Sequence, residues 1–207
     1  MTRSRFPGNE LPNGSLQSRV QTTHGWHTPR VTATLQTPAL HVPFGNEPAR
    51  RITVGRGSDN TQPSFSPDGR RLAFTSGRSG HPEVYISDAD GTNAELLTPY
   101  NFGDQSYRAN PDWSPDGRLI AFEAQLSGRM QVMTIGLRDR VIKRHTSEGA
   151  NEQPSWAPDA RHLVFTSNRG GTRQLWVLDV ESNTVRQLTH APAGARFGAW
   201  SPTLRAR

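Results

Sequence analysis

The chain has 207 residues, a net charge of +6 and no cysteine. The lack of Cys excludes disulfides, thiolate nucleophiles and cysteine-ligated metal sites. No stretch approaches the ~20 apolar residues of a transmembrane helix, so we expect no membrane span.

The positive charge is concentrated in the first quarter of the chain. Residues 1–56 hold seven Arg and two Glu, a net charge of +5, whereas residues 57–207 hold 17 basic and 16 acidic residues. Binding to nucleic acid depends on basic residues clustered against phosphates. The nearly neutral body of the chain therefore predicts no nucleic-acid partner.

Residues 1–28 form a leader without the pattern of a folded element. The first basic residues are followed by polar residues, Gly and Pro, and not by the apolar segment of a secretory signal. We expect the leader to be disordered and residues 29–207 to form one domain. At the start of this domain, three segments favour partial strands within residues 31–54: residues 31–35 (VTATL), 40–42 (LHV) and 49–54 (ARRITV).

The remaining chain repeats one segment. The copies are PSFSPDGRRLAF (63–74), PDWSPDGRLIAF (111–122) and PSWAPDARHLVF (154–165), and a fourth copy begins as GAWSP (198–202). Successive copies are 48, 43 and 44 residues apart. This period is typical of a four-stranded propeller blade. We therefore predict an all-β fold, a β-propeller with three complete blades at about residues 59–98, 107–146 and 150–189.

Each copy predicts four strands joined by turns. The first strand is short and aromatic (64–65, 112–113, 155–156), the second contains a buried Phe (72–74, 120–122, 163–165), the third is apolar (84–86, 132–133, 175–177), and the fourth ends in Thr98, Thr146 or Thr189. Ser, Pro and Gly in the first loop suit a type I turn. The aromatic position of the first strand (Phe65, Trp113, Trp156, Trp200) favours packing between blades over a stacking platform for sugars or bases.

Three blades leave open sheet edges at both ends. The partial strands 31–54 and 198–202 could together complete a composite fourth blade and close the ring. Alternatively, the chain is an open arc, or it self-associates through its open blade edges, since two chains of three blades each would hold six.

The repeats resemble those of TolB-like β-propellers. The resemblance rests on the SPDG turns (66–69, 114–117) before a Leu/Ile-x-Phe strand, the SGRSG hairpin (76–80) and the run VYISDADG (84–91). It implies a non-enzymatic, periplasmic scaffold of the Tol–Pal system, which contacts a peptidoglycan-associated lipoprotein and maintains the outer membrane. Proteins of this family have an export signal and a propeller of six blades. This sequence shows three complete repeats and no apolar segment typical of such a signal. Similar blades also occur in carbohydrate-active enzymes and peptidases, so a propeller fragment of such an enzyme is the alternative.

No motif predicts catalytic, cofactor-binding or metal-binding residues. The seven His form no pair with metal-ligand spacing, and neither a nucleophile elbow nor a phosphate loop is present. We therefore expect no catalytic activity and no cofactor.

The loop of residues 99–110 is the longest loop between blades and contains three aromatic residues and an Arg. Aromatic residues and Arg are enriched where proteins bind one another. We expect Tyr107 and Arg108 to share one face with Arg78 and Arg169, which lie in the second loops of their blades, and to bind a protein partner. The alternative, that the loop packs on itself and the Arg side chains are solvated, stays open.

Overall fold

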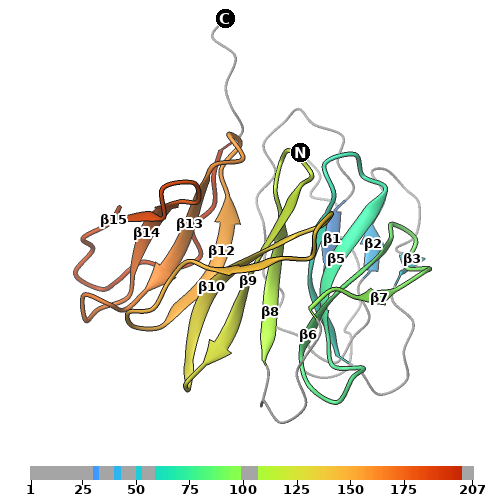
Figure 1. Cartoon of the computed structure of the whole chain (residues 1–207), viewed down its shortest axis with the longest axis horizontal. Coiled ribbons are helices and arrows are strands. Elements are labelled where there is room, and N and C mark those ends of the chain that lie inside the picture. The colour runs from blue at the N-terminus through green and yellow to red at the C-terminus, as the bar shows by residue number, and fades with distance from the viewer. Residues whose placement is uncertain (1–29, 33–39, 43–49, 53–58, 99–106, 202–207) are drawn as a thin grey trace, which may run out of the picture.

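The computed structural model describes residues 30–32, 40–42, 50–52, 59–98 and 107–201. The predicted leader and residues 99–106 of the long loop lie outside these ranges. Every regular element in the described ranges is a strand, as predicted, and the strands form three antiparallel four-stranded sheets and one three-stranded sheet. Figure 1 shows the four sheets side by side, with β1–β3 at one end and β15 at the other.

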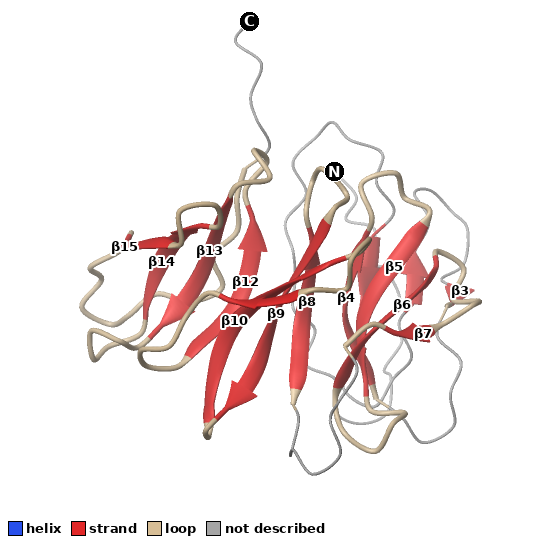
Figure 2. Ribbon diagram, viewed as in Figure 1, coloured by secondary structure: helices blue, strands red, loops and turns tan. Residues whose placement is uncertain are grey.

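The three four-stranded sheets are the predicted blades. Blade 1 contains β4 (Asn60–Phe65), β5 (Arg71–Ser76), β6 (Glu83–Asp88) and β7 (Glu95–Leu96). Blade 2 contains β8 (Arg108–Trp113), β9 (Leu119–Leu126), β10 (Arg129–Gly136) and β11 (Ile142–Arg144). Blade 3 contains β12 (Asn151–Trp156), β13 (His162–Ser167), β14 (Gln174–Asp179) and β15 (Thr184–Gln187). In each blade the strands pair in chain order, and the four strands per repeat are those predicted (Figure 2).

The first turn has the same length in each repeat, and this has a local cause. In blade 2, Gly117 N donates to Ser114 O at 2.9 Å, and Gly117 has φ +73°. The Ser114 hydroxyl donates to Asp116 Oδ1 at 2.6 Å and accepts from Leu119 N at 2.9 Å. The Ser-Pro-Asp-Gly sequence therefore satisfies its own polar groups and directs the chain into the second strand.

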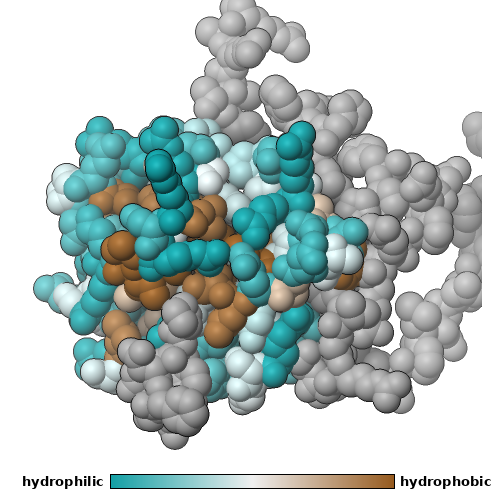
Figure 3. Space-filling model, turned by 45° about the vertical axis from the view of Figure 1, so that its right-hand side comes forward, coloured by the Kyte–Doolittle hydropathy of each residue, from teal (hydrophilic) through white to brown (hydrophobic). Residues whose placement is uncertain are grey.

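The core lies between the blades. Blade 1 presents Ala73, Val84, Ile86 and Leu97 to blade 2, and blade 2 presents Ala121 and Val132 to blade 3. Trp113 and Trp156 are buried in these two clusters, so packing between blades, and not a stacking platform, is the role of this position in blades 2 and 3. The remaining surface is mostly hydrophilic, although hydrophobic side chains gather toward the middle of one face (Figure 3).

The first strand of each blade is longer than predicted. It has six residues and includes Pro63, Pro111 or Pro154. Its pairing with the second strand shifts register around the Pro, for example between Thr61 and Ser64. Pro is tolerated in a strand at such a bulge because no ladder hydrogen bond is lost there.

The N-terminal partial strands form a sheet of their own. β1 (Arg30–Thr32), β2 (Leu40–Val42) and β3 (Arg50–Arg51) pair in this order, close to the predicted positions. Ile52, directly after β3, is buried against Leu72, Phe74 and Tyr85 of blade 1. This sheet therefore covers blade 1 as the last three strands of a preceding blade would.

The composite fourth blade, one of the alternatives that the sequence left open, is not formed by the described residues. The C-terminal segment lies against blade 3, where Phe197 N donates to Thr166 Oγ1 at 3.3 Å and Trp200 Nε1 donates to Ser155 O at 3.2 Å. β1 pairs only with β2. Figure 1 shows the sheet β1–β3 and the last strand of blade 3 on opposite sides of the row of sheets.

A buried histidine joins blades 2 and 3. His145 Nε2 lies 2.9 Å from Thr134 Oγ1, and its Nδ1 lies 2.7 Å from Asn183 Oδ1. Burial, opposed by the Asn183 hydrogen bond, lowers the pKa of His145 below 6.5. The folded protein thus holds this imidazole neutral under conditions in which the unfolded chain takes up a proton.

We expect His145 to make the fold sensitive to acid. Because its folded pKa is depressed, its stabilising contribution is present above pH 6.5 and is lost as the pH falls from 6.5 through the folded value. The equivalent positions in blades 1 and 3 hold Leu97 and Leu188, so His145→Leu uses a residue that the repeat already accepts. Urea titrations at several pH values should show a smaller loss of unfolding free energy below pH 6.5 in this variant. Parallel curves for the two proteins would contradict the assignment.

Candidate functional site

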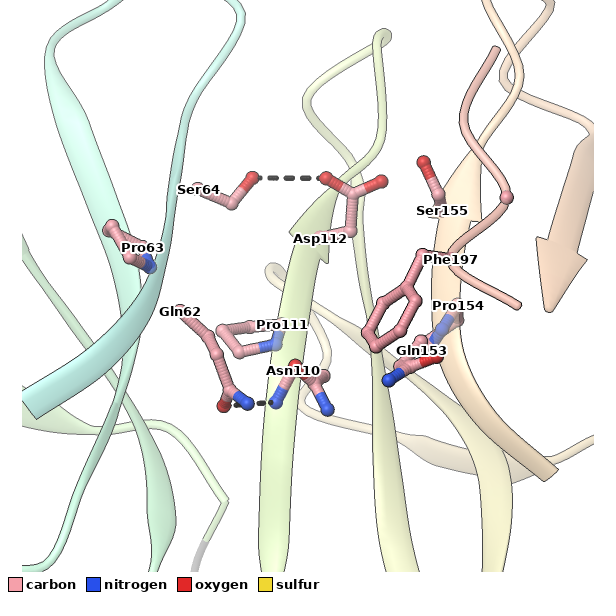
Figure 4. A pocket seen from close by; sticks show the side chains of 11 residues that line it. Gln62, Pro63, Ser64, Asn110, Pro111, Asp112, Gln153, Pro154, Ser155 and Phe197 are labelled. Atoms are coloured by element: carbon pink, nitrogen blue, oxygen red, sulfur yellow. Dashed lines mark hydrogen bonds between the residues drawn. The ribbon is translucent and has the colours of Figure 1, made fainter. Parts of the chain in front are cut away.

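The first strands of the three blades line a groove of about 460 Å³. The groove is lined by Gln62, Pro63, Ser64, Asn110, Pro111, Asp112, Gln153, Pro154, Ser155, Phe197 and Gly198. Each complete blade thus contributes one Gln/Asn-Pro-Ser/Asp tripeptide from the same place in its first strand (Figure 4).

The tripeptides share an unusual backbone conformation. Gln62, Asn110 and Gln153 have φ of 54°, 52° and 58°, and Phe197 has 57°. Non-glycine residues rarely adopt this left-handed conformation, and bulky side chains such as Phe do so least often. The bulge in each first strand holds the backbone in this form and presents the side chain before the Pro to the groove (Figure 4).

Side chains of the second strands fix these tripeptides to the next blade. Thr75 Oγ1 donates to Gln62 Oε1 at 2.8 Å and accepts from Asn110 N at 3.2 Å. In blade 3, Thr166 takes the same place and bonds Gln153 and the Phe197 backbone. The Nε2 groups of Gln62 and Gln153 donate to no residue in the described ranges, so they are available to a ligand.

Asp112 gives the groove a carboxylate in the position that Ser64 and Ser155 hold in the other blades. Its Oδ1 accepts from Ser64 Oγ at 3.2 Å and its Oδ2 from Trp156 N at 2.7 Å. Burial raises the pKa of Asp112, while these hydrogen bonds oppose the rise. A partly buried carboxylate beside two free amide donors can bind groups that both donate and accept hydrogen bonds.

Blade 2 carries a second carboxylate where blades 1 and 3 have Thr. Glu123 is buried, and its Oε2 accepts from Gln153 N at 2.7 Å. Burial raises its pKa, and the hydrogen bonds from Gln153 N and the Asn110 side chain oppose the rise. Glu123 thereby accepts a backbone N–H from the next blade, as Thr75 and Thr166 do at the same position of their blades. It does not line the groove.

Two of the predicted partner-binding residues are held within their own blades. The Arg78 guanidinium lies 4.8 Å from the Tyr85 ring centroid, and its Nη2 donates to Asn60 Oδ1 at 3.2 Å. Arg169 makes the same contacts in blade 3, with the Trp176 ring at 4.8 Å and Asn151 Oδ1 at 2.8 Å. Both side chains retain partial exposure.

The other two predicted residues lie at the start of β8. Arg108 Nη1 contacts Glu83 Oε1 at 2.9 Å, and Arg108 N donates to Pro82 O at 2.9 Å. Tyr107 is 38% exposed. Burial and the nearby Glu123 raise the pKa of its hydroxyl. The structure thus places Arg108 beside Pro82, at the end of the blade 1 loop that also contains Arg78, whereas Arg169 belongs to blade 3.

The groove was not predicted from the sequence. Its signal was present, because Gln62-Pro63, Asn110-Pro111 and Gln153-Pro154 precede the aromatic position by the same spacing in each repeat. In the described parts of the chain, no group of three or more His, Asp and Glu side chains could hold a metal ion. No helix in those parts is long and apolar enough to cross a membrane.

Comparison with known proteins places the repeat in one family. A family model described as the TolB beta propeller domain matches residues 40–204. The Tol-Pal system protein TolB of Bordetella pertussis is 50% identical over 50 residues, which are 24% of this chain and 11% of that protein. TolB from Acinetobacter baumannii is 25% identical with a TM-score of 0.69, over 83% of this chain and 44% of that chain.

An enzyme shares the fold at lower similarity. Oligogalacturonate lyase in complex with manganese is 17% identical with a TM-score of 0.56, over 72% of this chain and 41% of that chain. At this identity the likeness concerns the architecture alone. The chain spans less than half the length of the Acinetobacter protein that it matches. Since the family model covers most of the sequence and all three blades, this chain belongs to the TolB β-propeller family.

Proposed function

We propose that this protein is a non-enzymatic scaffold that binds a partner protein through the groove lined by its first strands. The observation that carries the proposal is the groove itself, in which three blades present equivalent tripeptides and the middle one supplies the Asp112 carboxylate. The Gln62 and Gln153 amides donate and Asp112 accepts. An extended peptide segment has the complementary groups along its backbone: carbonyl oxygens that accept hydrogen bonds and N–H groups that donate them.

The proposed partner is a peptidoglycan-associated lipoprotein, and the proposed location is the periplasm. Support comes from the relatives, which include a Tol-Pal system protein TolB with half of its residues identical in the matched region. The proposed role is maintenance of the outer membrane. Tyr107 and Arg108, at the start of β8, together with Arg78 and Arg169 in the second loops of blades 1 and 3, form a second candidate contact surface.

Asp112→Ser is the variant that tests the groove. Blades 1 and 3 carry Ser64 and Ser155 at this position, and Ser64 Oγ accepts from Trp113 N at 3.0 Å as Asp112 accepts from Trp156 N. The variant should therefore fold while it removes the groove's carboxylate. We expect its affinity for a purified peptidoglycan-associated lipoprotein to fall about tenfold or more, since a charged hydrogen bond contributes about 1.5–3 kcal/mol.

Isothermal titration calorimetry gives the measurement, with Glu181→Ser as the matched control. Glu181 is an exposed carboxylate in the last turn of blade 3, so its loss should leave the affinity unchanged. If Asp112→Ser binds as tightly as the unchanged protein while Tyr107→Ala binds weakly, the second loops and not the groove form the interface. If the unchanged protein does not bind the lipoprotein, the proposed partner is wrong.

A further inference from the structure

Two residues of the groove depart from the repeat, and both are held against blade 3. Blade 2 has Asp112 where the other two blades have Ser. After blade 3, Phe197 stands where the three blades have Gln or Asn with the same left-handed backbone. Asp112 Oδ2 accepts from Trp156 N at 2.7 Å, and Phe197 N donates to Thr166 Oγ1 at 3.3 Å. Residues that break a repeat without a structural need point to a function.

The negative charge of Asp112 is not required to join the blades. Its carboxylate accepts from the backbone N–H of Trp156, and in blade 1 the Ser64 hydroxyl accepts from Trp113 N at 3.0 Å in the same way. A neutral hydroxyl therefore fulfils this structural role. Burial raises the pKa of Asp112, which means that its surroundings disfavour the charged form.

The Asp112 carboxylate has no counter-ion, since no Arg, Lys or His of the described ranges forms an ion pair with it. Its printed partners, the Ser64 hydroxyl and Trp156 N, are neutral donors. By contrast, the buried carboxylate of Glu83 contacts Arg108 Nη1 at 2.9 Å. Among the described residues that line the groove, Asp112 alone is charged. A partly buried carboxylate attracts a cation more strongly than one in bulk water.

Phe197 brings an aromatic ring into the same groove. The residue is 73% exposed, and Figure 4 shows its side chain extending into the groove beside the tripeptide of blade 3. Its φ is 57°, in a region that bulky L residues rarely adopt. Such strain persists at positions where the side chain has a role in binding a ligand. The face of an aromatic ring attracts cations because it carries partial negative charge.

We infer that the groove binds a cationic side chain, Lys or Arg, of an extended segment of the partner protein, and that Asp112 and Phe197 recognise it. The inference rests on the proposed function, since it names the side chain that the groove selects in a bound peptide. A cation gains an ion pair with Asp112 and a contact with the Phe197 ring. The Gln153 amide, which lines the groove beside them, can donate to a backbone carbonyl of the same segment. A neutral side chain gains no ion pair, and an acidic one is repelled.

Peptide titrations followed by NMR spectroscopy test the inference on the full-length protein. The probes are four pentapeptides with blocked ends and Ala at every position except the centre, which holds Lys, Arg, Glu or norleucine. Norleucine has the length of Lys but no ammonium group. The backbone N–H signals of Trp156 and Phe197 report on the groove, because Trp156 N donates to Asp112. We expect the Lys and Arg peptides to shift both signals and to bind about tenfold more tightly than the norleucine peptide at low ionic strength.

Two variants use residues that the repeat already accepts. Asp112→Ser introduces the residue of blades 1 and 3, and we expect it to bind the Lys, Arg and norleucine peptides with equal affinity. Phe197→Gln introduces the residue of blades 1 and 3 at its position, and we expect it to reduce the preference for a cation about two- to fivefold. Glu181→Ser, which removes an exposed carboxylate of blade 3, is the matched control and should keep the full preference.

The outcomes separate this inference from the proposed function. A preference for Lys over Arg, or the reverse, with both above norleucine, supports the inference and identifies the side chain. Equal affinity for the Lys and norleucine peptides, with a shift at Trp156, overturns the inference but leaves the groove as a peptide site. A cation preference that survives in Asp112→Ser overturns it as well. If no peptide shifts the Trp156 signal, the inference is also wrong, and the titration with the lipoprotein decides the proposed function independently.

Discussion

Arg108→Ala is expected to lower the free energy of unfolding by about 3–5 kcal/mol. Arg108 Nη1 lies 2.9 Å from Glu83 Oε1 and 3.1 Å from Oε2, and the Glu83 side chain is 0% exposed. Removal of the guanidinium leaves the buried carboxylate with weaker partners, among them the Thr98 hydroxyl at 2.7 Å and the His81 ring at 3.6 Å. That loss is much larger than the usual effect of a surface ion pair, about 0–1 kcal/mol.

The repeat supplies a matched double variant. Glu83 accepts from the Thr98 hydroxyl at 2.7 Å, and in blade 2 Gln131 accepts from Thr146 at 2.8 Å in the same geometry. The third member comes from the following blade in each case. It is Arg108 of blade 2 for Glu83, and Asn151 of blade 3 for Gln131, where Asn151 Nδ2 donates to Gln131 Oε1 at 3.0 Å. Glu83→Gln/Arg108→Asn therefore rebuilds the blade 2 arrangement without charge.

Urea denaturation of the three proteins measures the pair. We expect the double variant to recover most of the stability that Arg108→Ala loses, because well-matched neutral groups can replace a buried ion pair at little cost. An Arg108→Ala protein as stable as the unchanged one would show that the ion pair does not hold blade 2 to blade 1. In that case Arg108 would remain a candidate for binding a partner protein.

Gly91→Ala should lower the free energy of unfolding by about 2–5 kcal/mol. Gly91 lies in the turn between β6 and β7 with φ +87°, a conformation that costs an L residue about 1–2 kcal/mol. A Cβ at this position would overlap the carbonyl oxygen of Ile52. The backbone after β3 would have to move, and Ile52 would lose packing against Phe74 and Tyr85, a loss on the scale of a core truncation.

Gly80→Ala separates the two causes. Gly80 has a φ of +100° in the same blade, but a Cβ there would meet no atom within 4 Å. It should therefore lose only the conformational cost of about 1–2 kcal/mol. Equal losses for the two variants, measured by urea denaturation, would mean that the contact of Ile52 with the β6–β7 turn does not stabilise the fold.

Arg108→Ala and Gly91→Ala each weaken the packing of one sheet against its neighbour, at two different interfaces. A propeller blade is stable only when both of its faces are covered, so each inter-blade contact holds two sheets in place. The Glu83–Arg108 pair holds blade 2 to blade 1, and Gly91 allows the sheet β1–β3 to approach blade 1 closely.

The four-stranded blades could be predicted from the sequence because their causes are local. Ser-Pro-Asp-Gly favours the first turn, and Phe74, Phe122 and Phe165 recur at the same distance from this turn. A short segment therefore determines both the turn and the strand that follows it. The first strands were predicted too short. Pro63, Pro111 and Pro154 suggest a strand end by propensity alone, and only the bulge allows the strand to continue through them.

The roles of individual side chains were not local and could not be predicted. Arg78 and Arg169 were predicted to bind a partner, with solvated side chains as the alternative, and the structure places each over aromatic rings of its own blade. Asp112 looks like a residue of a short strand, yet its carboxylate joins Ser64 of the blade before to Trp156 of the blade after. The Asp112 contacts depend on the angle between blades, which no single repeat encodes.

The sequence by itself determined the fold class, the number of complete blades, the family and the position of each strand to within a few residues. Only the tertiary structure decided where the groove lies, which carboxylates are buried, and that the segment 197–201 sits on blade 3 and not beside β1. The physical reason is one of range. Turn chemistry and alternating hydrophobicity act over a few neighbouring residues, whereas curvature and burial arise from the packing of whole sheets against one another.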